Sequence, residues 1–423
     1  MEASARSNPF SGLAAFFRRY GLAFVMVASY FGSGSIFIAS QAGVRYGYAL
    51  IWAVLGSVLL GFMAQDMSAR LGIFGKPLMA FTRDKLGTPI ALVIAVWLAI
   101  GCVLWTLELT AAVGAGISIL LGGVVGWQPI APLVGLAAIV VGIRGYESVE
   151  HIMTFMMFAL TVIYLIVMGA SRPDVGAMLA GAIPSGETLS IAVLPLIAAI
   201  LGTTALWPNF FLESILVREK GWTGDEHVPV MRRDLAIGYT VGGVITIAIL
   251  VVAASVLRRQ GVTELESFLT PGLALADVLG EWAMFLFVVG AISAAFNSIV
   301  PIMWAPAYLI PEALGHDPDS TSREFKIVYV AGVALGSLSP LVAAVTDLSV
   351  IDMIILFPAF NGIFGLPIAA VLLFWAINDR ETMGTHENTL GVNLLNGILV
   401  VMAIVLATLS ARGFVEAVAG GGI

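Results

Sequence analysis

Two short polar runs interrupt apolar stretches that are otherwise long enough to cross a membrane. The first run is Gly32-Ser33-Gly34-Ser35, and the second is Gly202-Thr203-Thr204-Ala205-Leu206-Trp207-Pro208-Asn209. Glycines weaken a helix, and a proline removes a backbone donor and clashes with the preceding turn. Within a bilayer, a broken helix is tolerated only where it is buried in protein or lines a cavity. Both runs are therefore candidate substrate-binding segments, with close packing of small residues as the alternative.

The first run contains no acidic, histidine or methionine side chain, so its backbone and hydroxyl groups would carry its chemistry. Backbone N–H groups from Gly34 to Ile36 would begin a second half-helix, and such a helix start favours an anion. The hydroxyl groups would add neutral donors. This chemistry favours a small carboxylate, an amino acid or a bicarbonate-type oxyanion, although hydroxyl and carbonyl oxygens can also hold a monovalent ion. The candidate substrate-binding residues are Gly32, Ser33, Gly34, Ser35, Thr203, Thr204, Leu206, Trp207 and Asn209.

Two acidic residues lie deep within apolar segments. Glu108 lies in the third such segment, and Glu213 lies in the second half of the sixth. Ionisable side chains inside membrane spans commonly serve ion pathways, and a carboxyl group in apolar surroundings can exchange protons near neutral pH. We expect Glu108 and Glu213 to couple transport to H⁺ or Na⁺, with a structural hydrogen bond as the alternative. Asp352, near the start of the tenth segment, is a third candidate for coupling.

The composition is that of a membrane protein. Of the 423 residues, 59% are hydrophobic and only 11% are charged, whereas a soluble domain carries about a quarter charged residues. The single cysteine, Cys102, excludes a disulfide within the chain, and the four histidines fall in or beside polar connections. No nucleophile–base or metal-ligating constellation is present in the sequence, so we expect no enzymatic activity, no cofactor and no resident metal. The net charge of −7 is spread over loops and indicates no nucleic-acid partner.

Eleven apolar segments have about the length that a helix needs to cross the bilayer. They are centred near residues 32, 57, 105, 136, 160, 203, 246, 293, 335, 364 and 400. With the N-terminus inside, the inner connections hold 15 of the 20 Lys and Arg residues and the outer connections hold 5. Because cytoplasmic connections are enriched in Lys and Arg, this bias predicts a multi-pass protein of the plasma membrane. The N-terminus is expected in the cytoplasm and the C-terminus outside.

The residues around both runs resemble a known family. The segment Gly32-Ser33-Gly34-Ser35, followed by Ser40-Gln41-Ala42-Gly43-Val44-Arg45-Tyr46-Gly47-Tyr48, is similar to the first span of the natural resistance-associated macrophage protein (Nramp) family of metal transporters. That family has Asp-Pro-Gly-Asn followed by Gln-Ala-Gly-x-x-aromatic-Gly-Tyr. The segment 65–72, Gln-Asp-Met-Ser-Ala-Arg-Leu-Gly, also resembles the family, and Gly202 to Ser214 is similar to its stretch around Met-Pro-His-Asn.

The resemblance implies an all-α integral membrane protein with the LeuT-type fold. This fold is a five-plus-five inverted repeat, here with eleven transmembrane helices, of which helices 1 and 6 are unwound at mid-membrane. It predicts one transporter domain over residues 1–423. Within it, residues 1–20 form a cytoplasmic N-terminal segment, about 21–170 the first repeat, about 190–380 the second repeat and about 390–412 an extra helix 11.

This chain departs from the family at the residues that carry the chemistry. Gly32 stands where the family has a metal-binding Asp, Ser35 where it has Asn, and Leu206 where it has a Met that favours soft metals. Glu213 replaces a His of helix six, and Glu108 matches an acidic residue of helix three. A dehydrated divalent cation would be poorly compensated without carboxylates.

These departures lead to three hypotheses. The first is an Nramp-like secondary transporter of a small anion, coupled to H⁺ or Na⁺. The second is a divalent-cation transporter for Mg²⁺ or Mn²⁺, in which waters and carbonyl groups replace the lost ligands. The third is a membrane sensor that does not transport, which the short loops and the lack of an appended soluble domain disfavour.

Overall fold

The computed structural model describes residues 20–186, 188–190, 193–265 and 267–419, and this part of the chain is helical, without strands. The predicted N-terminal segment, residues 1–20, lies outside the described residues except for Tyr20. The helices are α2 (Leu22–Tyr30), α3 (Ser33–Tyr46), α4 (Ile51–Phe74), α5 (Leu78–Leu86), α6 (Thr88–Leu120), α7 (Trp127–Gly142), α8 (Tyr146–Ala170), α9 (Val175–Gly181), α10 (Leu194–Thr204), α11 (Trp207–Glu219), α12 (Val228–Ser255), α13 (Thr270–Leu279), α14 (Glu281–Ala313), α15 (Arg323–Gly336), α16 (Ser339–Thr346), α17 (Val350–Ile377), α18 (Arg380–Met383) and α19 (Leu390–Ala419).

The helices agree with the predicted apolar segments. Within the described residues, eight helices are long and apolar enough to cross a membrane, and the bent pair α2 and α3 forms a ninth span. The predicted centres near residues 136 and 400 fall in two shorter apolar helices, α7 and the Leu390–Val405 part of α19. Each of the eleven predicted centres therefore lies in an apolar helix or, for the centre near residue 32, at the break between two.

The first predicted interruption is a sharp break. Helices α2 and α3 meet at an angle of 65°. Gly32 is extended, with φ −115° and ψ −164°, immediately before the first residue of α3. The N–H of Ile36 donates to the carbonyl of Gly32 at 3.2 Å, so the second half-helix starts directly after the break. The glycine-rich run thus turns one apolar segment into two half-helices.

The second interruption is shorter. Helix α10 ends at Thr204 and α11 begins at Trp207, which leaves Ala205 and Leu206 outside either helix. Pro208 lies in the first turn of α11. The N–H groups of a first turn have no carbonyl partner within the helix, so the proline removes no helical hydrogen bond there. The proline therefore starts the second half-helix, as the sequence predicts, and the two-residue gap exposes backbone groups between the halves.

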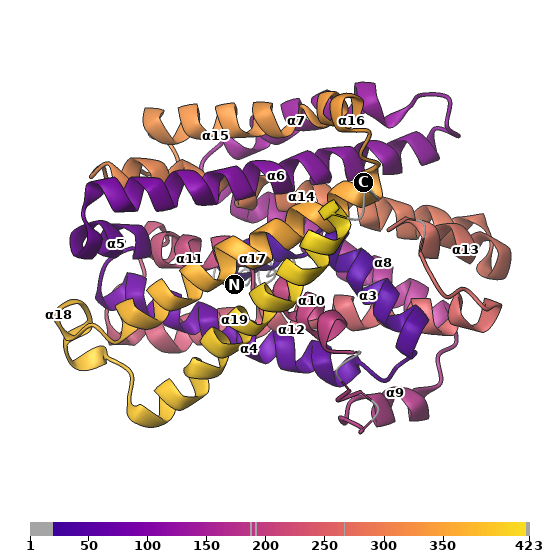
Figure 1. Ribbon diagram of the computed structural model, residues 1–423, viewed down its shortest axis with the longest axis horizontal. Helices are drawn as coiled ribbons and strands as arrows, with labels where there is room; N and C mark the ends of the chain where they lie inside the picture. Colours follow the sequence, from indigo (N-terminus) through magenta and orange to yellow (C-terminus); the bar gives the residue numbers. More distant parts are fainter. Residues whose placement is uncertain (1–19, 187, 191–192, 266, 420–423) are drawn as a thin grey trace, which may run out of the picture.

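The remaining helices surround these two breaks. The 33-residue helices α6 and α14 run alongside one another across the molecule, and α7 and α15 pack beyond α6 on one side (Figure 1). Helix α12 packs against α2, α3 and α4, and α17 packs against α6 and α19. The first broken segment consequently lies between α12 on one side and α14 on the other, whereas α10 and α11 pack against α4, and α11 also packs against α14 and α17.

Three glycines let helix backbones touch directly. A Cβ at Gly43 of α3 would lie 2.2 Å from the carbonyl oxygen of Leu250 in α12, and a Cβ at Gly72 of α4 would lie 2.2 Å from that of Ser214 in α11. A Cβ at Gly238 of α12 would lie 2.5 Å from Ala23 in α2. Such small-residue contacts are a common basis of helix association in membranes.

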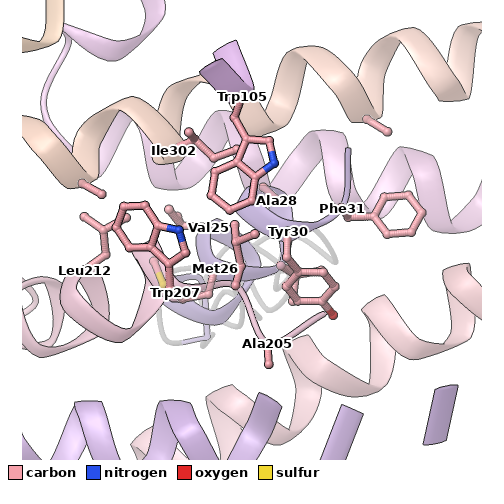
Figure 2. Packing of buried hydrophobic residues seen from close by; sticks show 14 of the residues in the cluster. Val25, Met26, Ala28, Tyr30, Phe31, Trp105, Ala205, Trp207, Leu212 and Ile302 are labelled. Carbon is pink, nitrogen blue, oxygen red and sulfur yellow. The ribbon is translucent and has the colours of Figure 1, made fainter. Parts of the chain in front are cut away.

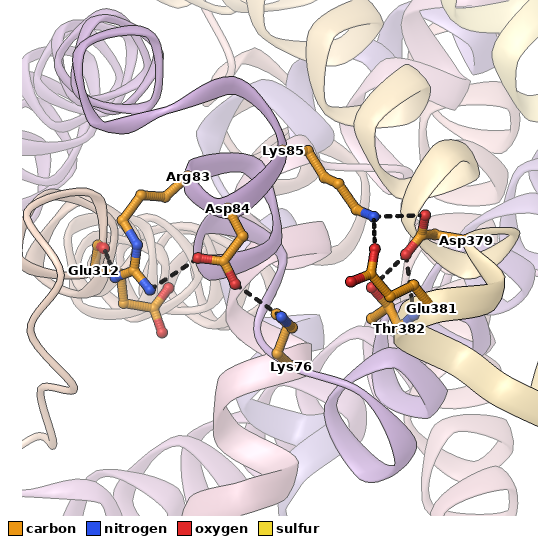
Figure 3. Close-up of polar contacts among 8 residues, drawn as sticks. All are labelled: Lys76, Arg83, Asp84, Lys85, Glu312, Asp379, Glu381 and Thr382. Atoms are coloured by element: carbon orange, nitrogen blue, oxygen red, sulfur yellow. Dashed lines mark hydrogen bonds and ion pairs between the residues drawn. The ribbon is translucent and has the colours of Figure 1, made fainter.

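One end of the molecule carries a rim of ion pairs around the short helix α5 (Figure 3). Lys76 donates to Asp84 at 2.8 Å, Arg83 donates to the same carboxylate at 3.2 Å, and Lys85 lies 2.9 Å from Asp379. Partial burial raises the pKa of Asp84, but the hydrogen bonds from Lys76 and Arg83 outweigh it and hold this pKa below its usual value. The pairs anchor α5 to its neighbours, although exposed pairs of this kind contribute only about 0–1 kcal/mol each.

Substituting Gly43 or Gly72 by alanine is expected to destabilise the protein by about 1–3 kcal/mol, because the added methyl group meets a backbone carbonyl that cannot rotate away. The thermal midpoint of the detergent-solubilised protein would report this loss. Gly169→Ala in α8 is the matched control, since nothing lies within 4 Å of its Cβ position. Equal midpoints for Gly43→Ala and Gly169→Ala would contradict direct backbone contact between α3 and α12.

Candidate functional site

A cavity of about 410 Å³ lies at the two breaks. It is lined by both halves of each broken helix and by α6, α14 and α17. It follows α3 from Gly34 to Arg45, whose side chain is half exposed, so this end of the cavity reaches the surface. Glu108 is the one acidic side chain among the described residues that line it. In the predicted orientation, the Arg45 end faces outside.

Glu108 is tied directly to the first break. The hydroxyl of Ser33 donates to Glu108 Oε2 at 2.6 Å. Both residues are buried, with 0% and 2% of their surfaces exposed. A hydroxyl-to-carboxyl hydrogen bond of this length is at the short end of the usual range. The carboxyl group of α6 is therefore held at the first residue of α3, at the mid-point of the broken span.

The carbonyl groups at the end of α2 have no further helical turn to bond to, and side chains from other segments satisfy them. Asn209 Nδ2 donates to the carbonyl of Met26 at 2.9 Å, and the hydroxyl of Ser298 in α14 donates to that of Ala28 at 2.7 Å. The hydroxyl of Ser35 donates to the carbonyl of Tyr30 at 2.5 Å, across the break. These bonds compensate the backbone at the break with partners from within the protein.

The same bonds fix the chemistry that the cavity offers. A serine or threonine hydroxyl has one hydrogen to donate and two lone pairs to accept with. Ser33, Ser35 and Ser298 donate that hydrogen to acceptors within the protein. Thr203 donates to the carbonyl of Ile200 at 3.0 Å. The hydroxyl groups at the breaks therefore present lone pairs, whereas the sequence led us to expect donors for an anion. The remaining donors along the cavity are the N–H groups at the start of α3 and, toward its surface end, the side chains of Gln41 and Arg45.

Trp105 and Trp207 line one side of the cavity. Figure 2 shows both indole rings among the buried residues. The rings of Trp105 and Trp207 stack with centroids 6.1 Å apart and an angle of 27°. The indole N–H of Trp207 donates to Asn361 Oδ1 at 3.1 Å, and Asn361 Nδ2 donates to the carbonyl of Gly101 at 2.9 Å. Asn361 thereby connects α17 to both α6 and α11 and holds the orientation of the Trp207 ring.

The structure separates the candidate residues into two groups. Those that line the cavity are Gly32, Gly34, Ser35, Glu108, Thr203, Leu206 and Trp207. Ser33 lies directly behind, bonded to Glu108. Thr204 and Asn209 point away and bond to the backbone carbonyls of Ile200 and Met26. Glu213 is buried apart from the cavity.

Several residues outside the predicted set contribute to the site. Ser298 and Asn361 line the cavity and anchor its walls, and both are polar residues in the middle of apolar helices. That isolated polarity is the sequence signal that could have identified them. Asp352 has a different role, because it forms a capping box with Ser349 at the start of α17. Its position is explained by helix capping.

The sequence model described as "Natural resistance-associated macrophage protein-like" (Nramp) matches residues 23–411, which is nearly the whole chain. The chain belongs to the Nramp family. Two curated relatives of this Nramp chain carry the name "Divalent metal cation transporter MntH". The one from Pectobacterium carotovorum is 28% identical over 91% of this chain and 92% of its own length. The one from Aeromonas hydrophila is 26% identical over 91% and 93%.

Solved structures show that the Nramp chain has the predicted all-helical LeuT-type fold. A manganese transporter of Eremococcus coleocola superposes with a TM-score of 0.81 at 17% identity, covering 99% of this chain and 90% of that one. MhsT in complex with L-phenylalanine superposes with a TM-score of 0.61 at 15% identity, covering 93% and 98%. The chain is thus a multi-pass membrane protein of a transporter family, with its first helix broken at Gly32.

Asn361→Leu is expected to destabilise this Nramp protein by about 1–3 kcal/mol, because it leaves the indole N–H of Trp207 buried without an acceptor. Thermal midpoints should be measured for Asn361→Leu, Trp207→Phe and the double variant. In the Trp207→Phe background the N–H is absent, so Asn361→Leu should cost less there. Strictly additive effects would contradict a role for the indole–amide bond.

Proposed function

We propose that this Nramp chain transports a divalent cation, such as Mg²⁺ or Mn²⁺, that keeps much of its hydration shell in the cavity. The observation that carries this proposal is the direction of the hydroxyl hydrogen bonds. Ser35, Ser298 and Thr203 donate to backbone carbonyls and present lone pairs. Water molecules bound to a cation are strong donors, so acceptor-lined walls suit a hydrated cation.

Charge supports the same reading. Glu108 is the acidic side chain at the cavity and is bonded to Ser33. A carboxylate there would attract a cation and repel an anion, while the cationic Arg45 lies at the other, surface end of the cavity. Two relatives are named divalent metal cation transporters, and the superposed Eremococcus coleocola protein is named a manganese transporter. The N–H groups at the start of α3 are what favours the small anion, such as bicarbonate, and that alternative is kept as an outcome of the test.

The choice among divalent cations follows from the residues at the breaks. Gly32 and Ser35 offer no carboxylate or amide, and Leu206 offers no sulfur. Soft ligands select transition metals, whereas Mg²⁺ binds oxygen and gives up its waters reluctantly. We therefore propose that the site accepts Mg²⁺ at least as well as Mn²⁺. Coupling to H⁺ or Na⁺ through Glu108 and Glu213, with the N-terminus in the cytoplasm, completes the proposal.

The decisive experiment is flux into liposomes that contain the purified protein. Saturable uptake of Mg²⁺ and Mn²⁺ is expected, and Glu108→Gln should reduce it roughly tenfold or more, since hydrogen bonds to charged groups contribute about 1.5–3 kcal/mol. The exposed Glu281→Gln in α14 is the control and should retain uptake. Saturable bicarbonate uptake without any divalent-cation flux would establish the anion alternative instead.

Restoring family-like ligands should change the selectivity. The double variant Gly32→Asp with Leu206→Met is expected to raise Mn²⁺ and Cd²⁺ uptake relative to Mg²⁺, because it adds a carboxylate and a soft sulfur to the breaks. The new Cβ at position 32 would meet the Leu109 and Ser298 side chains at 3.0 Å, so a small adjustment is required. Gly32→Asp with Leu206→Ile controls for side-chain volume. Equal selectivity in both double variants would contradict a role for position 206.

A further inference from the structure

A second cavity lies where α8, α12 and α13 end, and we name it the three-helix-end pocket. Its volume is about 630 Å³. The ends of α8 and α12, the residues that follow each of these two helices, and the end of α13 line it. None of its lining residues lines the cavity at the breaks. A ligand in this pocket would therefore be distinct from the transported substrate.

Two arginines give the pocket a positive charge. Arg172 follows α8 and Arg259 follows α12, and both side chains are exposed. Within the described residues, neither side chain forms an ion pair or a hydrogen bond, and no acidic residue lines the pocket. Asp174, close to Arg172 in the sequence, caps α9 instead by accepting from the N–H of Ala177 at 3.0 Å. The two guanidinium groups are therefore available to an anion.

The alternative explanation is that the arginines only balance the negative ends of the three helices. Carbonyl groups at those ends are already bonded by the chain itself. The N–H of Ser171 donates to the carbonyls of Val167 and Met168 at 3.0 and 3.2 Å, and the N–H of Gly280 donates to that of Ala276 at 3.0 Å. These carbonyl groups need no guanidinium donor, which leaves the charge of both arginines for a ligand.

Arg172 also has an unusual backbone conformation. Its φ of 48° lies in the left-handed region, which favours glycine. Strain of this kind is found preferentially at ligand-binding sites, where the surrounding structure maintains it. A glycine at this position would remove the strain together with the guanidinium group. The strained arginine therefore indicates that its side chain is used.

The pocket lies at the boundary between membrane and water. Helix α8 is a 25-residue span that ends at Ala170, so its end lies at the level of the lipid headgroups. Toward the membrane, α8 exposes Leu165 and Ile166, and α13 exposes Val278, which lines the pocket. Trp282 at the start of α14 is 49% exposed, as is typical of aromatic residues at a membrane surface. An acyl chain can lie against this apolar surface while its headgroup reaches the arginines.

We propose that the three-helix-end pocket binds the phosphate group of an anionic membrane lipid through Arg172 and Arg259. A guanidinium group matches phosphate oxygens with paired, charge-assisted hydrogen bonds. The side-chain amide of Gln260 is a further donor in the pocket. In the predicted orientation the lipid belongs to the outer leaflet, and these arginines are two of the 5 basic residues in the outer connections. The inference is independent of the proposed function, because it involves no residue of the substrate cavity.

The pocket adjoins the contacts that hold the C-terminal end of α3. Arg258, next to Arg259 in the chain, donates to the carbonyl of Val44 at 2.9 Å. The hydroxyl groups of Tyr48 and Ser255 lie 2.8 Å apart, and Ser255 lines the pocket. A lipid bound here contacts the same end of α12 that fixes α3. Because such a ligand binds only the folded protein, it raises the free energy of unfolding.

Lipid titration of the full-length protein in detergent, followed by native mass spectrometry, tests the pocket without any transport. We expect phosphatidylglycerol, whose headgroup is anionic, to bind more tightly than phosphatidylcholine, whose headgroup is neutral overall. The double variant Arg172→Gln with Arg259→Gln should weaken phosphatidylglycerol binding roughly tenfold or more, because it removes two basic residues from the headgroup level. The control Arg144→Gln with Arg380→Gln removes the same charge from exposed positions elsewhere and should bind like the wild type.

A conservative variant separates a ligand site from a folding defect. Arg172→Lys with Arg259→Lys keeps the charge and should retain most of the binding. The thermal midpoint should rise with added phosphatidylglycerol in the wild type, the Lys variant and the control. It should rise less in the Gln double variant, whose midpoint in phosphatidylcholine should match that of the wild type.

Three results would contradict the proposal. Equal affinity for phosphatidylglycerol in the Gln double variant and the wild type would overturn the pocket as the site. Equal affinity of the wild type for phosphatidylglycerol and phosphatidylcholine would show that the negative charge of the headgroup is not recognised. Binding of inorganic phosphate that depends on Arg172 and Arg259, without binding of phosphatidylglycerol, would assign the pocket to a free anion in place of a lipid.

Discussion

The structure depends on one constraint: an unwound backbone inside a membrane must find hydrogen-bond partners within the protein. The break at Gly32 frees the carbonyl groups at the end of α2. Asn209, Ser298 and Ser35 come from three different helices to satisfy them. The arrangement of α11, α14 and α3 around α2 is therefore set by backbone chemistry as much as by apolar packing.

This constraint also decides what the cavity can bind. Each hydroxyl hydrogen that stabilises the backbone is unavailable to a substrate, so the walls become acceptors. Glu108, held by Ser33, places a carboxyl group at the same break. Under the proposed function, hydration water on a cation would supply donors to these acceptors, which would compensate for the missing acidic and sulfur ligands.

Much of the fold was predictable from sequence, and the reason is physical. Apolar length reveals spans, while Gly32 and Pro208 reveal where helices stop. The direction of hydrogen bonds was not predictable, because a hydroxyl can donate or accept and its choice depends on distant segments. The hydroxyl of Thr204 bonds to a carbonyl of its own helix and the amide of Asn209 to a carbonyl of α2, so neither residue lines the cavity. Asn361, 154 residues from its partner Trp207, required the tertiary structure.

The direct contact of Gly238 with Ala23 has a mechanical consequence. Helix α12 packs along the first half of the broken helix, and at this point the glycine hydrogen faces the methyl group of Ala23. Each methyl-sized enlargement of the side chain at position 238 would increase the distance between α12 and α2. Substitutions of increasing size at position 238 are therefore a means of separating α2 from α12 stepwise.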